Sequence, residues 1–392
     1  MRNLDQVDVF SKIGRSKPIR PSKLSVLSVC PWQYLLSTEQ NCSPVLEVNP
    51  IGVLGSAMHK IIEKYAGQHT LKGLEVQQMI ANEFEKKISL QPDNLLKRTF
   101  IRLGVNGVIN PQRLLSASRL AFKSIRTAPQ KKLGIELSFQ NFETHSSDFI
   151  RERKLSSTEL ELEGWPDLVY KNENVIHVVD YKLSLRKNED GKPKESYILQ
   201  AAAYGLLAKE CYKNSNVVLE LISPTDKWVS PLDSELEIYV RTKLKQASNA
   251  LPFGEVFDAS QIARTGLHCV ECSYRPGCMA YNAKFLEGQQ KSSETICSND
   301  VFGQILAIKE ADGFLSLEVE STFEKRKVVV EGVLKYSNSN PSIGSNFVGY
   351  GLGTTEIKGR GKYVANFHIF NPTNPTNSAF SSYAKTYDAH HL

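Results

Sequence analysis

Residues 175–182, with the sequence VIHVVDYK, predict a buried β-strand that ends in two charged side chains. Residues two apart in a strand point to the same face, so Asp180 and Lys182 are expected to project together. A carboxylate can hold a divalent cation while an ammonium lies beside the same water or phosphate. A surface ion pair on an edge strand is the simpler alternative. The Val-Ile-His-Val-Val run is too apolar for a solvated edge, which favours a functional pair.

A second carboxylate precedes this strand in LEGWPDLVY, residues 162–170. The runs 167–170 and 175–182 are joined by Lys-Asn-Glu-Asn, which predicts a β-hairpin with Asp167 on the neighbouring strand. Gly164 allows a close backbone approach, while Pro166 fixes its own φ and favours an extended Trp165. A turn aspartate bound by nearby amides is the alternative for Asp167.

Two helices flank the hairpin in sequence. In VLGSAMHKIIEKYA, residues 53–66, a helical apolar stripe leaves His59 on its flank, where it could reach into a cleft or simply be exposed. In YILQAAAYGLLAK, residues 197–209, Gln200 and Tyr204 are four apart and share a helical face. Three alanines between them allow close packing on a sheet, although an ordinary amphipathic helix would have the same pattern.

A cysteine cluster lies further along the chain, in HCVECSYRPGC at residues 268–278. The spacing Cys269-x2-Cys272-x5-Cys278 is typical of thiolates that bind zinc or an iron–sulfur cluster. His268 is a candidate for a nearby fourth ligand. The chain contains 7 cysteines in no regular framework, which favours ligation over disulfides. Cys42, Cys211 and Cys297 have no partners at ligand spacing and are interpreted as ordinary thiols.

Composition indicates a protein with more than one domain and a sizeable core. The chain has 392 residues, of which 41% are hydrophobic and 23% charged, with a net charge of +6. This mild basic excess is compatible with a polyanionic partner. The sequence has no long apolar run that predicts a membrane span, no apolar core of a signal peptide and no P-loop motif. We therefore expect a cytoplasmic protein that does not power unwinding itself.

Changes in composition along the chain predict five regions. They are a basic arm over residues 1–23, a main α/β domain over 24–285, a linker over 286–300, a small β-barrel over 301–370 and a loosely ordered tail over 371–392. Within the main domain, helices are expected over 24–36, 53–66, 75–126 with a break near 104–111, 197–210 and 234–250. Further strands are expected over 132–139, 159–163 and 217–222.

Five β-like runs with glycine-bearing turns over residues 301–370 predict an OB-like fold. Such a barrel could bind single strands through basic and stacking side chains. The equally acceptable alternative is that the aromatic residues are core and the charges a solvated face. The candidates are Lys325, Arg326, Lys327, Lys358, Arg360 and Lys362 as backbone contacts, and Tyr350, Tyr363 and Phe367 as stacking residues.

Taken in order, the motifs resemble the RecB-like branch of the PD-(D/E)XK nucleases. The resemblance covers roughly residues 24–285 and rests on Gly55-x-x-x-His59, Gly164-x-x-Asp167, Asp180-Tyr181-Lys182 and Gln200-x-x-x-Tyr204. Trp165-Pro166 departs from the basic-aliphatic pair often found before the aspartate. The resemblance implies an α/β fold with a restriction-endonuclease-like core.

The same resemblance implies the roles of these residues. His59, Asp167, Asp180 and the Tyr181 carbonyl would bind Mg²⁺ or Mn²⁺. Lys182 would orient the nucleophile or stabilise the transition state. Gln200 and Tyr204 would position DNA and Lys182.

A second resemblance concerns the segment around Cys30. The segment CPWQY before a helix is similar to the N-terminal cysteine of iron–sulfur RecB-like nucleases, among them AddB, a eukaryotic flap-processing helicase-nuclease and CRISPR-adaptation nucleases. In that group one ligand precedes the nuclease core and three follow it. The resemblance implies a structural [4Fe–4S] cluster on Cys30, Cys269, Cys272 and Cys278, an iron–sulfur clasp, with zinc as the less favoured occupant.

The resemblance predicts a metal-dependent DNA nuclease that acts on single strands or DNA ends, alone or beside a separate helicase or other nucleic-acid-processing protein. A non-cleaving DNA-binding or scaffold subunit with the same fold is the main alternative, and an RNA-directed nuclease is a weaker one. Sequence alone leaves open the polarity and whether cleavage is exo- or endonucleolytic.

Overall fold

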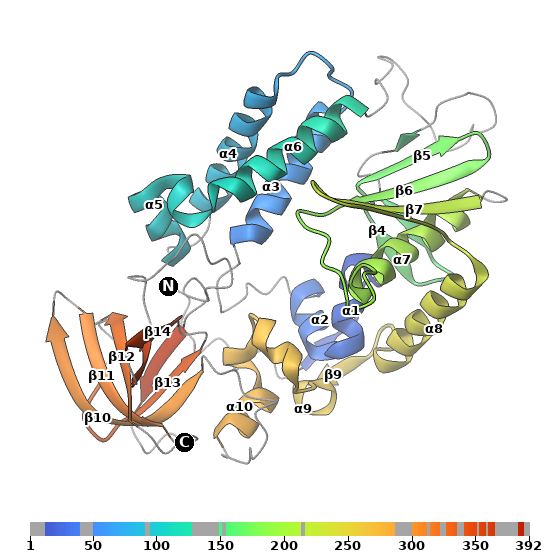
Figure 1. Ribbon diagram of the computed structural model, residues 1–392. Helices are drawn as coiled ribbons and strands as arrows, with labels where there is room; N and C mark the ends of the chain where they lie inside the picture. The colour runs from blue at the N-terminus through green and yellow to red at the C-terminus, as the bar shows by residue number, and fades with distance from the viewer. Residues whose placement is uncertain are drawn as a thin grey trace.

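The predicted strand at residues 175–182 is the central strand of a five-stranded sheet in the structure, a computed structural model (Figure 1). The sheet order is β2-β5-β6-β7-β8. Strand β6 pairs antiparallel with β5 in the predicted hairpin and parallel with β7. The bounds are β2 Phe149–Ile150, β5 Leu168–Asn172, β6 Val175–Tyr181, β7 Asn216–Ile222 and β8 Lys227–Pro231.

The structure describes most of the main domain and the strands of the C-terminal region. The described residues are 12–39, 50–90, 95–127, 149–150, 154–212, 216–286, 300–311, 314–321, 327–334, 341–350, 353–357, 360–364 and 383–387. The strand expected at 132–139, Cys42, Cys297, Lys325, Arg326, Lys358 and Phe367 lie outside them.

Both faces of β6 are covered by helices. Ile176 and Val178 belong to a core with helix α7, Glu195–Cys211, which lies between β6 and β7 in the chain. Val179 and Tyr181 belong to a second core with helix α3, Pro50–Tyr65. This alternation explains why apolar residues dominate both faces of the strand, because a strand covered on both sides has no solvated face.

Helix α3 packs with α4, Gly73–Ser89, and α6, Pro111–Thr127, on one side of the sheet (Figure 1). Between them α5, Leu95–Val108, is interrupted at Gly104, whose φ of 67° is outside the helical region. The predicted break near residues 104–111 is therefore confirmed. Helix α8, Ser234–Ala250, contacts α7 on the other side of the sheet.

The N-terminal region differs from its prediction at two points. The helix expected over 24–36 is two helices, α1 Leu24–Val29 and α2 Pro31–Thr38, because Cys30 is extended and Pro31 can begin a helix but not continue one. The described part of the predicted arm is packed in place. Strand β1, Lys12–Gly14, pairs with β9, Val256–Asp258, and the fully buried Arg15 donates to Leu251 O and Glu161 Oε2.

Short elements complete the main domain. The strand expected over 159–163 is a turn followed by β4, Leu162–Gly164, which pairs with β3, Leu155–Ser157. Helices α9, Ala259–Ile262, and α10, Met279–Leu286, flank the cysteine loop.

The C-terminal region forms a seven-stranded sheet in the order β14-β15-β12-β11-β10-β13-β16. Strands β10, β11 and β12 form an antiparallel meander, and β12 pairs parallel with β15. Strand β16 lies within the stretch expected to be loosely ordered, yet pairs with β13. The bounds are β10 Val301–Ala311, β11 Phe314–Ser321, β12 Lys327–Leu334, β13 Asn346–Tyr350, β14 Gly353–Ile357, β15 Arg360–Val364 and β16 Tyr383–Tyr387.

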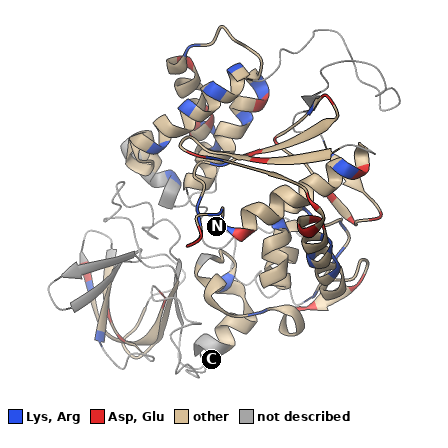
Figure 2. Ribbon diagram, turned by 45° about the vertical axis from the view of Figure 1, so that its right-hand side comes forward, with Lys and Arg blue, Asp and Glu red and all other residues tan. Residues whose placement is uncertain are grey.

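Two global properties bear on partners. Basic and acidic positions are interspersed along the helices that cover the sheet (Figure 2). Among the described residues, the helices are too short or too polar for one of them to traverse a lipid bilayer.

Candidate active site

The end of β6 brings Asp180 and Lys182 together. Lys182 Nζ lies 2.7 Å from Asp180 Oδ2, as expected for two side chains on one face. Asp180 is only 3% exposed. Its Oδ2 is in ion-pair contact with Lys182, but the angles are not those of a hydrogen bond, so this buried oxygen has no hydrogen-bond partner. A buried carboxylate oxygen with spare acceptor capacity is suited to a cation.

Asp167 lies just before β5 and is fixed against the end of β6. Its Oδ2 accepts a hydrogen bond of 2.7 Å from the Tyr181 backbone N–H. This contact holds the second carboxylate beside Asp180 although 14 residues separate Asp167 from Tyr181.

Gly164 explains how that segment can approach the site. A Cβ at Gly164 would lie 2.7 Å from Tyr204 Cε1 and 2.9 Å from Pro21 Cδ, distances too short for real contacts. The close approach inferred from the sequence is thus a packing requirement.

His59 reaches the same place from α3, with 27% of its side chain exposed. Its Nδ1 lies 3.0 Å from Asp167 Oδ1. Burial lowers the pKa of His59, but the charge and hydrogen bond of Asp167 outweigh it and raise the pKa to about 9, with Asp180 adding to the rise. In the metal-free protein at neutral pH, His59 is therefore an imidazolium paired with Asp167.

Helix α7 supplies Gln200, which bridges the charged pair. Its Nε2 donates to Asp180 Oδ1 at 3.0 Å, and its Oε1 accepts from Lys182 Nζ at 3.0 Å. The Lys182 ammonium also lies 5.3 Å from the centre of the Tyr197 ring, a contact that the sequence did not predict. One turn after Gln200, Tyr204 is buried beside both carboxylates.

Burial and charge shift the pKa values of this group. Burial raises the pKa of Asp180, and Asp167 raises it further, against the lowering effect of Lys182. Burial lowers the pKa of Lys182, but the carboxylate of Asp180 more than offsets this and the pKa rises. The pKa of Tyr204 is raised by burial and by the charges of Asp180 and Asp167. Two carboxylates held this close repel one another, so a cation between them would stabilise both.

The donor set fits a hard divalent cation, although its side chains also contact one another. In the described ranges no three histidine, cysteine, aspartate or glutamate side chains are arranged as a ready metal site. His59 is hydrogen-bonded to Asp167, whereas Asp180 accepts a hydrogen bond from Gln200 and forms an ion pair with Lys182. An ion would have to replace some of these contacts. Two carboxylates, an imidazole and a carbonyl are ligands that Mg²⁺ or Mn²⁺ accepts.

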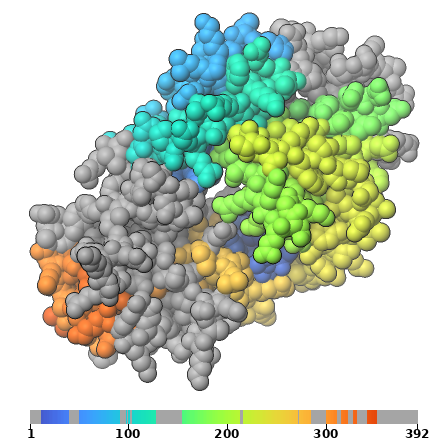
Figure 3. All heavy atoms as spheres, viewed as in Figure 1, coloured from blue at the N-terminus to red at the C-terminus, as the bar shows by residue number. Residues whose placement is uncertain are grey.

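On the face drawn in Figure 3, a hollow lies between the helical segment of α4–α6, coloured blue to cyan, and the green segment of the chain.

The four predicted cysteine ligands (the cysteine centre) lie near enough to affect one another's pKa values, but among the described residues they too are not arranged as a ready metal site. Cys30 lies at the break between α1 and α2, and the other three lie on two 3₁₀ turns, Leu267–Glu271 and Arg275–Gly277, and just after them. Burial, together with the charges of Cys30, Cys269 and Cys278, raises the pKa of Cys272 to about 12. Burial, together with the charges of Cys30 and Cys269, raises the pKa of Cys278 to about 11. Cys30, Cys269 and Cys272 are buried, and Cys278 is half-buried. A cation beside these thiols would favour their thiolates.

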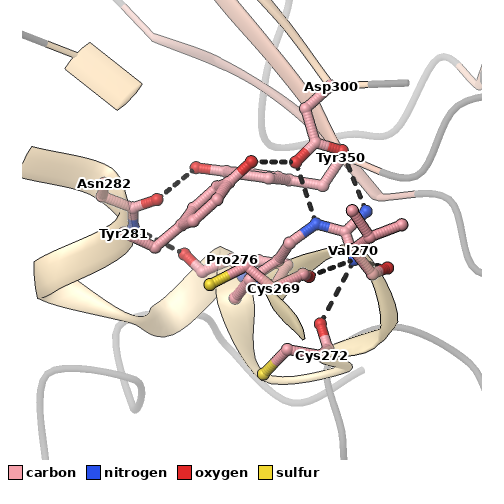
Figure 4. Close-up of polar contacts among 9 residues, drawn as sticks. Cys269, Val270, Cys272, Pro276, Tyr281, Asn282, Asp300 and Tyr350 are labelled. Atoms are coloured by element: carbon pink, nitrogen blue, oxygen red, sulfur yellow. Dashed lines mark hydrogen bonds and ion pairs between the residues drawn. The ribbon is translucent and has the colours of Figure 1, made fainter. Parts of the chain in front are cut away.

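Arg275, inside the cysteine loop, connects this centre to the C-terminal sheet (Figure 4). Its Nη1 donates to the carbonyls of Val270 at 3.1 Å and Cys272 at 3.2 Å, and its Nε donates to Asp300 Oδ2 at 2.8 Å. Tyr281 OH donates to the same Asp300 oxygen at 2.6 Å.

Tyr350 makes a second link across this junction, because its OH donates to Asn282 Oδ1 at 2.8 Å. Tyr350 is buried, so the expectation that it stacks on a single strand is wrong. Lys327, by contrast, is largely exposed and pairs with Glu318 at 3.3 Å.

Comparison with known proteins adds a family assignment. Residues 18–279, about two thirds of the chain, match the family model described as the PD-(D/E)XK nuclease superfamily. The matched range includes each residue of the two centres described above. Comparison with curated proteins gave no match.

Proposed function

The chain belongs to the PD-(D/E)XK nuclease superfamily, and on this premise we propose that it is a metal-dependent DNA nuclease of the RecB-like type. Membership of the superfamily indicates nuclease chemistry. The RecB-like assignment is supported by a histidine on a helix before the carboxylates and by a Gln-x-x-x-Tyr helix after them.

The observation that carries the proposal is the meeting of His59, Asp167, Asp180 and Lys182 at the end of β6. A divalent cation held by His59, the two aspartates and the Tyr181 carbonyl would lower the pKa of a water molecule and offset charge on the scissile phosphate. Lys182, protonated at neutral pH, donates hydrogen bonds to the attacking water or to a phosphate oxygen. Gln200 holds the ammonium in place by accepting one of its protons.

We propose single strands or DNA ends as the substrate, with a separate helicase or other DNA-processing protein as a partner. The net charge of +6 supports a polyanionic substrate without naming it. The C-terminal sheet is proposed to be OB-like and to add backbone contacts such as Lys327, whose ammonium is accessible.

We also propose that the cysteine centre holds a structural [4Fe–4S] cluster. Three buried thiols and one half-buried thiol, one before the catalytic residues and three after them, support this ligand set. Anaerobically purified protein should be brown with four iron atoms per cluster, and Cys272→Ser should bleach it. A colourless protein that contains stoichiometric zinc would show that the cysteines hold zinc and not an iron–sulfur cluster.

Cleavage of end-labelled single- and double-stranded DNA with Mn²⁺ under anaerobic conditions tests the enzymatic proposal. Asp180→Asn keeps the shape of the side chain but removes its charge. Cleavage should fall by at least about 100-fold, as for loss of one electrostatic contact to the transition state. Metal-dependent cleavage that survived this change would end the catalytic assignment.

A non-cleaving DNA-binding subunit is the second candidate. It is favoured by the direct contact between His59 and Asp167, which a metal would have to disrupt. Titration with Mn²⁺ distinguishes the nuclease from the non-cleaving subunit. A nuclease should bind Mn²⁺ as the wild type and lose this binding in Asp167→Ala. A non-cleaving subunit should show no Mn²⁺ binding that depends on Asp167.

A further inference from the structure

We infer that Trp165, Arg20 and Lys23 form a subsite that holds an unpaired nucleotide of single-stranded DNA beside the catalytic carboxylates. The inference rests on the proposed function and narrows its substrate class. It starts from an exposed aromatic side chain, because Trp165 is 43% exposed although Gly164 and Pro166 on either side of it are buried.

The indole is held close to the reaction site. Trp165 precedes Asp167 by two residues, so their Cα atoms are at most about 7 Å apart. The preceding Gly164 is packed against Tyr204 and Pro21. The backbone of Trp165 also hydrogen-bonds to Tyr204, whose neighbour Gln200 bridges Asp180 and Lys182. A base stacked on this ring would place its phosphates near the carboxylates.

Cations surround the ring. Arg20 Cζ lies 5.9 Å and Lys154 Nζ 5.6 Å from its centroid. Lys154 is already paired with Glu163 at 2.6 Å. Within the described ranges, neither Arg20 nor Lys23 forms an ion pair, and the buried Nε of Arg20 has no hydrogen-bond partner.

Lys23 adds to this uncompensated charge, because it lies one turn after Arg20 and its backbone N–H donates to the Arg20 carbonyl at 2.8 Å. Burial lowers the pKa of Lys23, and the nearby Arg20 lowers it further. Two adjacent cations with no carboxylate partner favour an anion, and a backbone phosphate is the anion that accompanies a stacked base.

The stacking contact decides which DNA fits. A base on an aromatic ring contributes roughly 5- to 150-fold in affinity, more than an exposed cation over the same ring. A base can therefore take the place of the exposed Lys154 ammonium. Bases inside a duplex are already stacked and paired, so only single strands or frayed ends can offer one.

Tryptophan fluorescence measures this contact in the full chain without cleavage. The protein has 3 tryptophans; Trp32 is buried, and Trp228 packs against the sheet core. Titration with a short single strand in EDTA should quench the wild type and Trp228→Phe, but not Trp165→Phe. A strand with one abasic position in the bound register should quench less, and a blunt duplex hardly at all. Equal quenching in Trp165→Phe, or equal quenching by duplex, would overturn the subsite.

Affinity measurements complete the test. Trp165→Ala should weaken single-strand binding about 10-fold, and Trp165→Phe, which retains a ring, about 2- to 3-fold. Arg20→Gln and Lys23→Gln should each reduce the salt slope by about 1. The matched control Lys209→Gln, at the exposed end of α7, should leave the slope unchanged. Unchanged slopes in Arg20→Gln and Lys23→Gln would remove the phosphate contacts.

The two proposals fail in different ways. If quenching depends on Trp165 but DNA is not cleaved in Mn²⁺, the subsite proposal stands and the nuclease proposal is refuted. Cleavage that is unaffected by Trp165→Ala, with unaltered binding, would leave the nuclease and refute the subsite. Trp165→Phe and Trp165→Ala should unfold at the wild-type temperature, because the side chain is outside the core.

Discussion

Arg275 and Asp300 form a buried ion pair with two parallel hydrogen bonds, from Nε to Oδ2 at 2.8 Å and from Nη2 to Oδ1 at 2.9 Å. Arg275 belongs to the cysteine loop, and Asp300 directly precedes β10. The pair therefore joins the cysteine loop of the nuclease domain to the C-terminal sheet.

Asp300→Ala should lower the free energy of unfolding by about 3 to 5 kcal/mol, because it leaves the buried guanidinium without its carboxylate. Urea unfolding measures the change. The matched control is Glu318→Ala, which removes an exposed pair with Lys327 and should cost at most about 1 kcal/mol. Equal losses in the two variants would show that the junction carries no special stability.

The raised pKa of His59, about 9, predicts how metal binding depends on pH. A metal needs the neutral imidazole, so binding must release a proton below that pH. Affinity for Mn²⁺ should rise about 10-fold per pH unit from pH 7 toward 9 and then level off. Calorimetry in buffers of different ionisation enthalpy counts the released proton, and His59→Gln should flatten the profile.

The same pKa predicts the opposite trend for the stability of the metal-free protein. The pKa of His59 is higher in the folded state than its ordinary value of 6.5, so its contribution is complete below pH 6.5 and is lost as the pH rises through about 9. Urea unfolding of wild type and His59→Gln at pH 6 and pH 9.5 should show a difference at the lower pH only.

Two glycines of the family pattern should respond differently to alanine. A Cβ at Gly164 would collide with Tyr204 and Pro21, so Gly164→Ala should cost about 1 to 3 kcal/mol of stability and reduce cleavage. A Cβ at Gly55 would lie an ordinary 3.5 Å from Leu183 Cδ1 within helix α3. Gly55→Ala should therefore be tolerated, or stabilising through its helix propensity. Thermal unfolding and DNA cleavage of both variants test this contrast.

Gln200→Ala should separate positioning from metal binding. Gln200 contacts Lys182 and Asp180 but is not among the proposed ligands. The single-turnover cleavage rate should fall about 10- to 100-fold, since small misplacements of catalytic groups are costly, while Mn²⁺ affinity changes little. A parallel loss of metal binding would instead make Gln200 part of the metal site. Lys209→Gln, at the exposed end of the same helix, is the control.

The sheet core and its helices could be predicted from local patterns. The hairpin of β5 and β6 followed from apolar runs around a turn, and α7 followed from helical spacing. The meeting of Asp180 with Lys182 needed only the twofold repeat of a strand. Their meeting with His59 came from the family pattern, because no local rule brings α3 to β6.

The missed features depend on contacts between distant segments. Arg15 is a charged residue near the start of the chain, and nothing local predicts that it is fully buried beneath Leu251. Arg20 and Pro21 were assigned to an arm because polar, proline-bearing sequence is typical of one. Strand β8, Lys227–Pro231, was missed because it is short, begins with a charged residue and ends in Pro231. The sequence left open whether Tyr350 is exposed or buried, because its hydrogen bond to Asn282 joins residues that are 68 positions apart.

The pairing of β1 with β9 has a consequence for synthesis on the ribosome. The whole sheet, with His59, both aspartates and Lys182, is translated between these two strands. The first strand cannot find its partner until β9 has left the exit tunnel, and such distant pairings form slowly. A nascent chain stalled before β9 thus carries the proposed metal ligands, whereas Lys12–Gly14 still lacks its partner strand.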